Sequence, residues 1–318
     1  MKPRFDLEED LPVALLGCVV TIGNFDGVHL GHQSILRTAQ TLGDSIGAPV
    51  AAMTMDPPPD RVLHPGEQSL RLMPQEVKRA LLLEAGADCV VTAKVDAGFL
   101  AVSAEEFIER ILVGKFAARH VVEGPNFFFG RGRKGTLELL RQAGRTRGFE
   151  VHVVEPAVAE VGGVPERISS SLIRRRIVLG DVEGAHRCLG RPFALYGPVV
   201  RGEGRGRTWA FPTANLLPSE QVVPADGVYA GRARLCGADY LAAISVGGKP
   251  TLAAAEGRRA PLPRTVEAFL LDAQGDFYDK PMALGFLHRL RPQERFEGIQ
   301  QLRAQIAKDV QRVRQLLQ

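Results

Sequence analysis

The chain has 318 residues, of which 45% are hydrophobic and 24% are charged, and its formal net charge at pH 7 is +4. This composition is typical of a folded globular protein and excludes an intrinsically disordered chain, and the length is sufficient for two domains. The longest uncharged apolar run covers residues 11–23 and is too short to span a bilayer. The first ten residues are acidic where a secretion signal would be basic, so we expect a cytoplasmic protein without a membrane segment.

The composition also limits the kinds of partner. The four cysteines form no CxxC pair, which indicates reduced thiols and no disulfide framework. The small net charge, a single Trp and 6% aromatic residues argue against a nucleic-acid partner. A basic excess of this size is compatible with a site for small molecules that carry phosphate groups.

Residues 1–190 alternate short apolar runs with helical patterns. The predicted strands cover residues 13–22, 50–54, 89–92, 120–123 and 150–154. The predicted helices cover residues 29–42, 76–85, 104–112, 136–143 and 169–179. Strands alternating with helices predict an α/β domain with a parallel sheet and helices on both faces, whose ligand site lies at the carboxyl ends of the strands.

The pattern changes near residue 190, where we place a domain boundary. Short β-rich runs punctuated by Gly, Pro and Asp predict a small antiparallel barrel or sandwich. The predicted strands here cover residues 196–200, 228–234, 241–246, 265–272 and 282–287. Residues 294–317 then show the periodicity of one amphipathic helix.

The first candidate site is the turn after the first predicted strand, where a helix start carries His29 and His32 on either side of Gly31. Unpaired N–H groups and the macrodipole make such a start attractive to phosphate, and the glycine leaves room for a ligand to approach. Two imidazoles there can donate hydrogen bonds to a pentavalent transition state without a covalent intermediate. The alternatives are that the two histidines bind zinc or that their pairing has no function. Residues 29–32, the histidine tetrad His-Leu-Gly-His, closely resemble the HxGH signature of the nucleotidyltransferase superfamily.

A second signal lies at the start of the helix predicted over residues 169–179. Ser169, Ser170 and Ser171 can cap that helix or bind phosphate oxygens, and Arg174 follows one turn later. An ordinary cap followed by a solvated basic face is the alternative. The segment is similar to the Ser-Ser-Thr-x-x-Arg motif that accompanies HxGH in the same superfamily.

A glycine-bearing aromatic turn covers residues 121–130, at the end of a predicted strand. Its position at the carboxyl end of a strand is one where a planar ring could be held. The alternative is a hydrophobic loop that packs on the core.

The second half opens with a loop rich in Gly and Arg. Its backbone N–H groups and guanidinium groups can surround phosphate oxygens. Thr213 and Asn215 follow and offer a hydroxyl and an amide oxygen, which suit Mg²⁺, although Mn²⁺ fits the same atoms. A merely solvated loop is the alternative. The candidate phosphate contacts in this loop are Gly204, Arg205, Gly206 and Arg207.

Glu267 stands within an otherwise apolar predicted strand. A buried, isolated carboxylate is costly unless it is paired or used, so we expect a general base with a raised pKa, or a structural salt bridge.

The order of these motifs along residues 15–315 resembles that of the bacterial bifunctional riboflavin kinase/FAD synthetase family. The resemblance implies a Rossmann-like FMN adenylyltransferase domain over residues 1–190. It also implies a riboflavin kinase domain with a six-stranded barrel and a long terminal helix over residues 191–318. ATP would be the co-substrate of both reactions, riboflavin and FMN the flavin substrates, and FMN and FAD the products. We expect a monomer or a weak homo-oligomer.

The resemblance also implies roles for individual residues. His29 and His32 would contact the α-phosphate of ATP, and Glu267 would take the proton of the riboflavin 5′-hydroxyl. Asn126, Phe127 and Phe129 of the aromatic turn would line the cleft for nucleotide and flavin. Thr213 and Asn215 would help to hold MgATP. The ATP and phosphate contacts of the first domain would be Gly23, Phe25, Asp26, Gly31, Ser169, Ser170, Ser171 and Arg174.

Four positions depart from the usual family pattern. Ala210 replaces a Gly, Pro58 and Phe269 each replace a His, and Ser245 replaces an Asn. Two other functions therefore stay open at this point. One is an adenylyltransferase with an inactive, flavin-binding barrel, and the other is a nucleotidyltransferase with an RNA-binding second half.

Overall fold

The computed structural model describes residues 4–66, 70–161, 163–201, 213–248, 264–294, 296 and 298–318. The chain forms two compact units. The first consists of Met1–Leu70, Gln75–Glu160 and Val164–Ser169, and the second of Arg71–Pro74, Val161–Gly163 and Ser170–Gln318. The helices between residues 170 and 189 therefore pack within the second unit, and the functional boundary near residue 190 stays a prediction.

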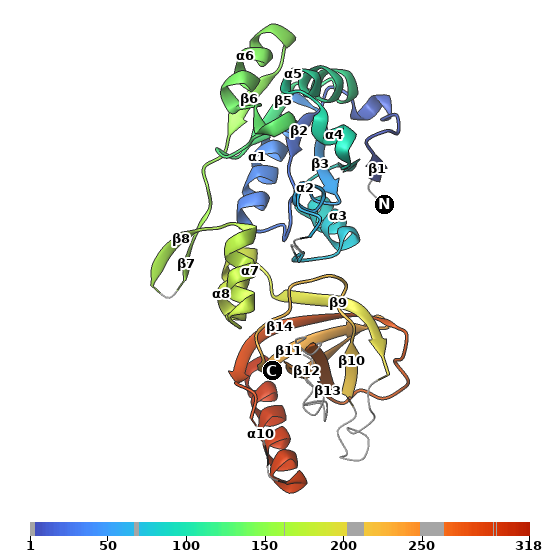
Figure 1. Ribbon diagram of the computed structural model, residues 1–318, viewed down its shortest axis with the longest axis vertical. Helices are drawn as coiled ribbons and strands as arrows, with labels where there is room; N and C mark the ends of the chain where they lie inside the picture. The colour runs from blue at the N-terminus through green and yellow to red at the C-terminus, as the bar shows by residue number, and fades with distance from the viewer. Residues whose placement is uncertain are drawn as a thin grey trace. The chain divides into compact units, whose positions relative to one another are not determined.

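The first unit is a parallel sheet with helices on both faces (Figure 1). Its strands are β1 (Arg4–Asp6), β2 (Val19–Ile22), β3 (Val50–Asp56), β4 (Cys89–Lys94), β5 (His120–Glu123) and β6 (Glu150–Val153), with β7 (Val158–Val161) and β8 (Val164–Arg167) as a separate ribbon. Its helices are η1 (Val13–Leu15), α1 (Leu30–Ile46), α2 (Pro59–Leu63), α3 (Gln75–Glu84), α4 (Ala97–Ala101), α5 (Ala104–Phe107), the π-helix η2 (Ile108–Lys115), η3 (Arg131–Arg133) and α6 (Leu137–Arg147).

The strand order is β1-β4-β3-β2-β5-β6, and each neighbouring pair is parallel. Alternate residues of β2 serve opposite faces, because side chains along a strand point to opposite sides. Val20 packs in a cluster with Leu112 and Phe116, whereas Val19 packs in a cluster with Ala39 of α1. The predicted α/β class is confirmed. The order reverses between β2 and β5, and the crevice at such a switch point is where open α/β sheets bind ligands.

The first predicted strand is shorter than expected. Residues 13–15 form a 3₁₀ turn, and only the last four residues of the range 13–22 are extended. Gly17 lies between the two segments with φ of +70°, a left-handed conformation that no strand residue adopts. The hydrophobicity of residues 13–22 predicts one strand because it does not show the turn that interrupts them.

The second unit is a closed antiparallel barrel (Figure 1). Its strands run in the order β10-β13-β12-β11-β14-β9 around the ring, which confirms the six-stranded barrel. The strands are β9 (Phe193–Val200), β10 (Thr213–Leu216), β11 (Gly227–Leu235), β12 (Ala238–Gly248), β13 (Arg264–Leu270) and β14 (Pro281–Arg291). The helices are α7 (Ser170–Val178), α8 (Val182–Leu189) and α10 (Ile299–Leu317).

The terminal helix covers part of the barrel wall. Val313 and Leu317 are buried in a cluster with Ala230 of β11. Asp309 is 6% exposed and accepts from Nη2 of Arg291 at 2.8 Å, so a nearly buried ion pair ties α10 to β14. The helix begins at Ile299 and not at residue 294 as predicted, because Gly298 stands at the N-cap in an extended conformation.

Candidate active sites

The turn from β2 into α1 lies at the switch point of the sheet. β2 pairs with β3 as far as Ile22, but its pairing with β5 ends at Val20 and Val121, so the two strands separate toward their carboxyl ends. The carboxyl group of Glu123 fills the gap, because its Oε1 accepts a hydrogen bond from the N–H of Ile22 at 2.6 Å. Burial raises the pKa of Glu123 well above its ordinary value, although this hydrogen bond acts in the opposite direction.

The two histidines of the motif form a stacked pair at the start of α1. Their ring centroids are 3.6 Å apart and their planes differ by 17°. His29 is the N-cap residue, and its Nδ1 accepts a hydrogen bond from the N–H of His32 at 3.4 Å. Because Nδ1 is the acceptor, the neutral ring of His29 carries its proton on Nε2. The turn thus provides an imidazole N–H donor beside the positive end of a helix.

The turn itself has a strained backbone. Phe25 and Val28 have φ of +50° and +37°, a region that is rare for aromatic and β-branched residues, and Gly27 between them has φ of +89°. Nε2 of Gln33 donates to the carbonyl oxygen of Val28 at 2.9 Å and holds the turn from inside the helix. Strain of this kind concentrates at functional sites, where the surrounding structure holds it in place.

A buried lysine fixes the same turn from α3. Lys78 is 4% exposed, and its Nζ donates to the carbonyl oxygens of Asn24 at 2.9 Å and of Met55 at 3.3 Å. Oγ1 of Thr54 also donates to the Asn24 carbonyl, at 3.2 Å. Oδ1 of Asn24 and Oγ1 of Thr21 are buried without a hydrogen-bond partner among the described residues. The carboxyl ends of β2 and β3 therefore combine a buried cation with polar atoms suited to a bound ligand.

The predicted ATP contacts of this turn are buried or half-buried, and their roles stay predictions. Phe25 and Asp26 are buried at 2% and 5% exposure, and Gly23 and Gly31 are half-buried. The edge of Phe25 meets the ring of His32, with centroids 5.1 Å apart.

The aromatic turn after β5 divides its side chains between surface and core. With its amide oxygen turned toward Arg167, Asn126 accepts from Nη1 and Nη2 at 3.0 and 3.1 Å. Phe127 is half-buried and stacks on Phe129, whose ring is 6% exposed and also contacts Phe107. Phe129 is thus part of the core of the unit. Asn126 and Phe127 keep surface that can face a ligand.

The predicted triphosphate residues lie where the chain passes from the first unit to the second. Ser169 ends the first unit, whereas Ser170 and Ser171 begin α7 in the second, and Arg174 follows one turn later. Ser171 is exposed, and the other three are half-buried. Their roles stay predictions.

The residues predicted to act in the kinase reaction lie on the outer face of the barrel. Glu267 of β13 is the register partner of Asn215 on β10 and of Ser245 on β12, so three polar side chains meet at one level of three adjacent strands. Thr213 shares this face of β10, because the buried Ala214 lies between it and Asn215. Oγ of Ser245 accepts from Nε2 of Gln293 at 2.8 Å.

Glu267 is half-buried and not fully buried as predicted. Strand alternation puts Val266 and Ala268 inside the barrel and Glu267 outside. The sequence of β13 is apolar on both faces because Phe269, on the outer face, packs in the cluster beneath α10. The predicted phosphate contacts Gly204, Arg205, Gly206 and Arg207, together with Ala210, lie outside the described residues.

Two family models match the chain, a FAD synthetase model over residues 12–172 and a riboflavin kinase model over residues 189–317. The bifunctional riboflavin kinase/FMN adenylyltransferase of Escherichia coli strain K12 is 37% identical over 294 residues, which cover 92% of this chain and 90% of the relative. The chain belongs to the bifunctional riboflavin kinase/FMN adenylyltransferase family. Membership confirms the resemblance and the two enzymatic functions predicted from the motifs.

A second relative of this family agrees. The bifunctional riboflavin kinase/FMN adenylyltransferase of Bacillus subtilis strain 168 is 34% identical over 300 residues, covering 92% of this chain and 90% of the relative.

A crystal structure from Streptococcus pneumoniae, described as a macrolide-efflux protein, has a TM-score of 0.85 and 29% identity and covers 97% of this chain and 96% of that one. That description names another function, but one fold can carry several functions. No helix in the described part of this chain is long and apolar enough to cross a membrane.

Three polar residues of these sites were missed by the sequence analysis. Lys78 interrupts the apolar pattern of a predicted helix, and Glu123 ends an apolar strand. Both are charged residues at positions that periodicity assigns to the interior, which is the signal that could have identified them. Gln293 follows β14 in a polar segment and carries no such signal.

Proposed function

We propose that the stacked histidines of α1 stabilise the transition state of adenylyl transfer from ATP to FMN. A phosphate oxygen of FMN attacks the α-phosphorus of ATP, the bond to the β-phosphate breaks, and FAD and pyrophosphate form. The Nε2–H of His29 donates to an oxygen of the α-phosphate while charge develops there, and His32 supports it from the stacked position. The observation that carries this proposal is the hydrogen bond from the N–H of His32 to Nδ1 of His29, which leaves Nε2 as the donor.

The surrounding residues bind and orient the substrates. Lys78 adds a buried positive charge at the carboxyl ends of β2 and β3, where the triphosphate would lie. Asn126 and Phe127 line the flavin side, with Phe129 supporting Phe127 from the core. The phosphate contacts of the proposal are Gly23, Phe25, Asp26, Gly31, Ser169, Ser170, Ser171 and Arg174.

For the kinase reaction, we propose Glu267 as the general base. It takes the proton from the 5′-hydroxyl of riboflavin as that oxygen attacks the γ-phosphorus of ATP, and FMN and ADP form. Glu267 is half-buried on the outer face of the barrel at the same level as Asn215 and Ser245, so the proposal places the hydroxyl group of riboflavin on this face.

Thr213 and Asn215 fit a divalent metal ion by their chemistry. They are alternate residues of β10, so a hydroxyl and an amide oxygen lie on the same face, and neutral oxygens suit Mg²⁺ or Mn²⁺. A bound ion would neutralise negative charge on the phosphates of ATP. Asn215 also borders Glu267 across the strand pair, so the metal-binding and base roles belong to one site.

The remaining parts of the proposal concern the whole chain. We assign adenylyl transfer to residues 1–190 and the kinase reaction to residues 191–318. We propose a cytoplasmic monomer or weak homo-oligomer that binds riboflavin, FMN and ATP and no nucleic acid, with Mg²⁺ as the working metal.

Replacing the histidines tests the adenylyl-transfer proposal. His29→Ala and His32→Ala should each lower FAD formation from supplied FMN by about a hundredfold or more, because each removes part of a preorganised donor. FMN formation from riboflavin should continue at the rate of the unmodified protein. His64→Ala, at an exposed histidine of the same unit, is the matched control and should change neither rate. Undiminished FAD formation in His29→Ala would overturn the assignment.

A further inference from the structure

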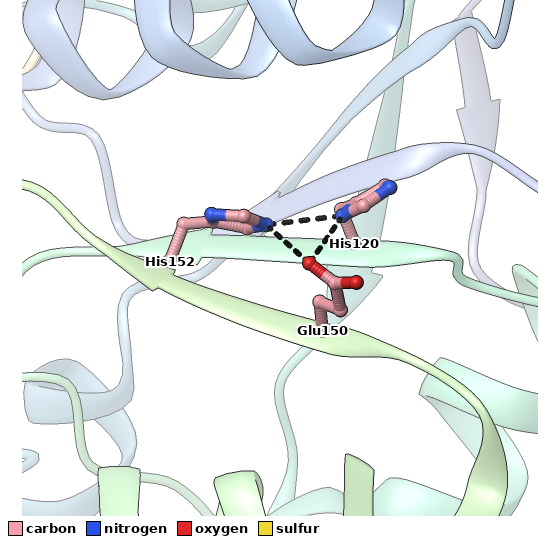
Figure 2. Close-up of side chains that lie close together, drawn as sticks. All are labelled: His120, Glu150 and His152. Atoms are coloured by element: carbon pink, nitrogen blue, oxygen red, sulfur yellow. Dashed lines mark hydrogen bonds and ion pairs between the residues drawn. The ribbon is translucent and has the colours of Figure 1, made fainter. Parts of the chain in front are cut away.

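A second cluster of histidines lies at the edge of the parallel sheet, on β5 and β6 (Figure 2). His120 is the first residue of β5 and is the register partner of Glu150, the first residue of β6. His152 is two residues beyond Glu150, so all three side chains project from the same face of the two strands. None of them has a part in the two reactions described above.

Three donor atoms of this cluster converge. Nδ1 of His120 is 3.0 Å from Nε2 of His152, and Oε2 of Glu150 is 3.8 and 3.7 Å from these two nitrogens (Figure 2). A point equally distant from three atoms with these separations lies about 2.0 Å from each of them, which matches the usual lengths of zinc–nitrogen and zinc–oxygen bonds. The three atoms therefore already surround a position of the right size for such an ion.

The ligand types and the charge of the cluster suit a cation. Neutral imidazole nitrogens are common ligands of transition-metal ions. The carboxylate of Glu150 supplies the one negative charge among the three ligands.

The exposure of the cluster leaves a way in for an ion. The side chain of His120 is 13% exposed, that of His152 is 30% exposed and that of Glu150 is 72% exposed. Three protein ligands with one side open to solvent leave the fourth coordination position to water.

We infer that His120, Glu150 and His152 form a binding site for one divalent transition-metal ion of the Zn²⁺ class. Two imidazole nitrogens and one carboxylate oxygen select such ions over Mg²⁺, which prefers oxygen ligands only. The site is thus chemically distinct from the magnesium position proposed in the kinase barrel.

The position of the site indicates a structural effect. His120 begins β5, whereas Glu123, at the other end of that strand, contacts β2 beside the adenylyl-transfer turn. The ion would join β6, the edge strand of the sheet, to β5. A ligand that binds only the folded state raises its stability.

Titration with Zn²⁺ tests the inference. The full chain is prepared metal-free in a Cys236→Ser background, because Cys236 is an exposed thiol and thiols also bind zinc. Calorimetry should then show one strong Zn²⁺ site per chain, and saturating Zn²⁺ should raise Tm. His152→Ala in this background should weaken binding by at least about tenfold and remove the rise in Tm.

Two further variants complete the test. His64→Ala, at an exposed histidine outside the cluster, should bind Zn²⁺ as the parent does. Glu150→Ala removes a largely exposed ligand with little risk to folding and should weaken binding in the same way as His152→Ala. Absence of Zn²⁺ binding in the parent, or equal binding by Glu150→Ala and His64→Ala, would overturn the inference and leave the His120–His152 contact as a hydrogen bond only.

Discussion

The imidazole ring of His29 lies beside Gly31, within contact distance of the place that a side chain at position 31 would take. A β-carbon at position 31 would stand 3.1 Å from Cε1 and 3.2 Å from Nδ1 of that ring. The glycine of the motif therefore makes room for the first histidine as well as for a ligand. The hydrogen bond between Nδ1 of His29 and the N–H of His32 depends on this placement.

Gly31→Ala should separate stability from activity. The added methyl group displaces the His29 ring, so we expect FAD formation from FMN to fall at least tenfold. Ala is the better helix former by about 1 kcal/mol, so the free energy of unfolding should not fall by a comparable amount. Gly66→Ala, where a β-carbon meets no atom of the described residues within 4 Å, is the matched control. Full activity of Gly31→Ala would show that the ring tolerates displacement.

Lys78→Met should affect both folding and adenylyl transfer. The change removes the Nζ that donates to the carbonyl groups of Asn24 and Met55, although Oγ1 of Thr54 still donates to the Asn24 carbonyl, so we expect the free energy of unfolding to fall by about 1–3 kcal/mol. FAD formation should fall because the turn before α1 loses its fixed position. Urea denaturation and the FMN assay check the two effects, with the exposed Lys134→Met as control. A variant as stable and active as the control would refute this role for the lysine.

Glu123→Gln should change how stability depends on pH. The pKa of Glu123 is raised in the folded state, so both folded and unfolded chains hold the proton below the ordinary value of 4.5. As the pH rises above that value, the unfolded chain loses the proton first and the free energy of unfolding falls. Gln cannot ionise, and its amide oxygen can still accept from the N–H of Ile22.

We therefore expect the stability of Glu123→Gln relative to the unmodified protein to increase between pH 5 and pH 8. Urea denaturation at these two pH values measures the difference. Glu138→Gln, at an exposed position, should show no such trend. A stability difference between Glu123→Gln and the unmodified protein that is the same at both pH values would contradict the raised pKa.

Much of the fold could be predicted because its local signals agree with its packing. Strand and helix periodicities located β3 to β6 and α1 within a few residues, since the apolar residues of these elements pack in the core clusters of the unit. β10 was missed because the polar residues Thr213 and Asn215 leave no apolar run over its four residues, Thr213–Leu216. The strand predicted over residues 13–22 is longer than β2. Gly17 interrupts it through its backbone conformation, which a hydrophobicity pattern does not show.

The sites were predictable only in part. The histidine tetrad is visible because its residues are consecutive, whereas the Lys78–Asn24 contact joins residues 54 positions apart. The burial of Glu267 was overestimated, because a sequence does not show that α10 covers Phe269 on the outer face of β13. The sequence likewise could not pair His120 with His152, since their contact depends on the register of β5 and β6.

The central claim is that one chain carries two separate transfer sites, and Glu267→Gln tests it most directly. The variant and the unmodified protein are each incubated with MgATP and either riboflavin or FMN, and the flavins are separated by chromatography. Glu267→Gln should lose FMN formation by a factor of about a hundred or more, as expected for a general base, and keep FAD formation from supplied FMN. Asp239→Asn, which removes an exposed charge of the same barrel, should keep both reactions. Undiminished FMN formation in Glu267→Gln, or a parallel loss of both reactions, would contradict the account.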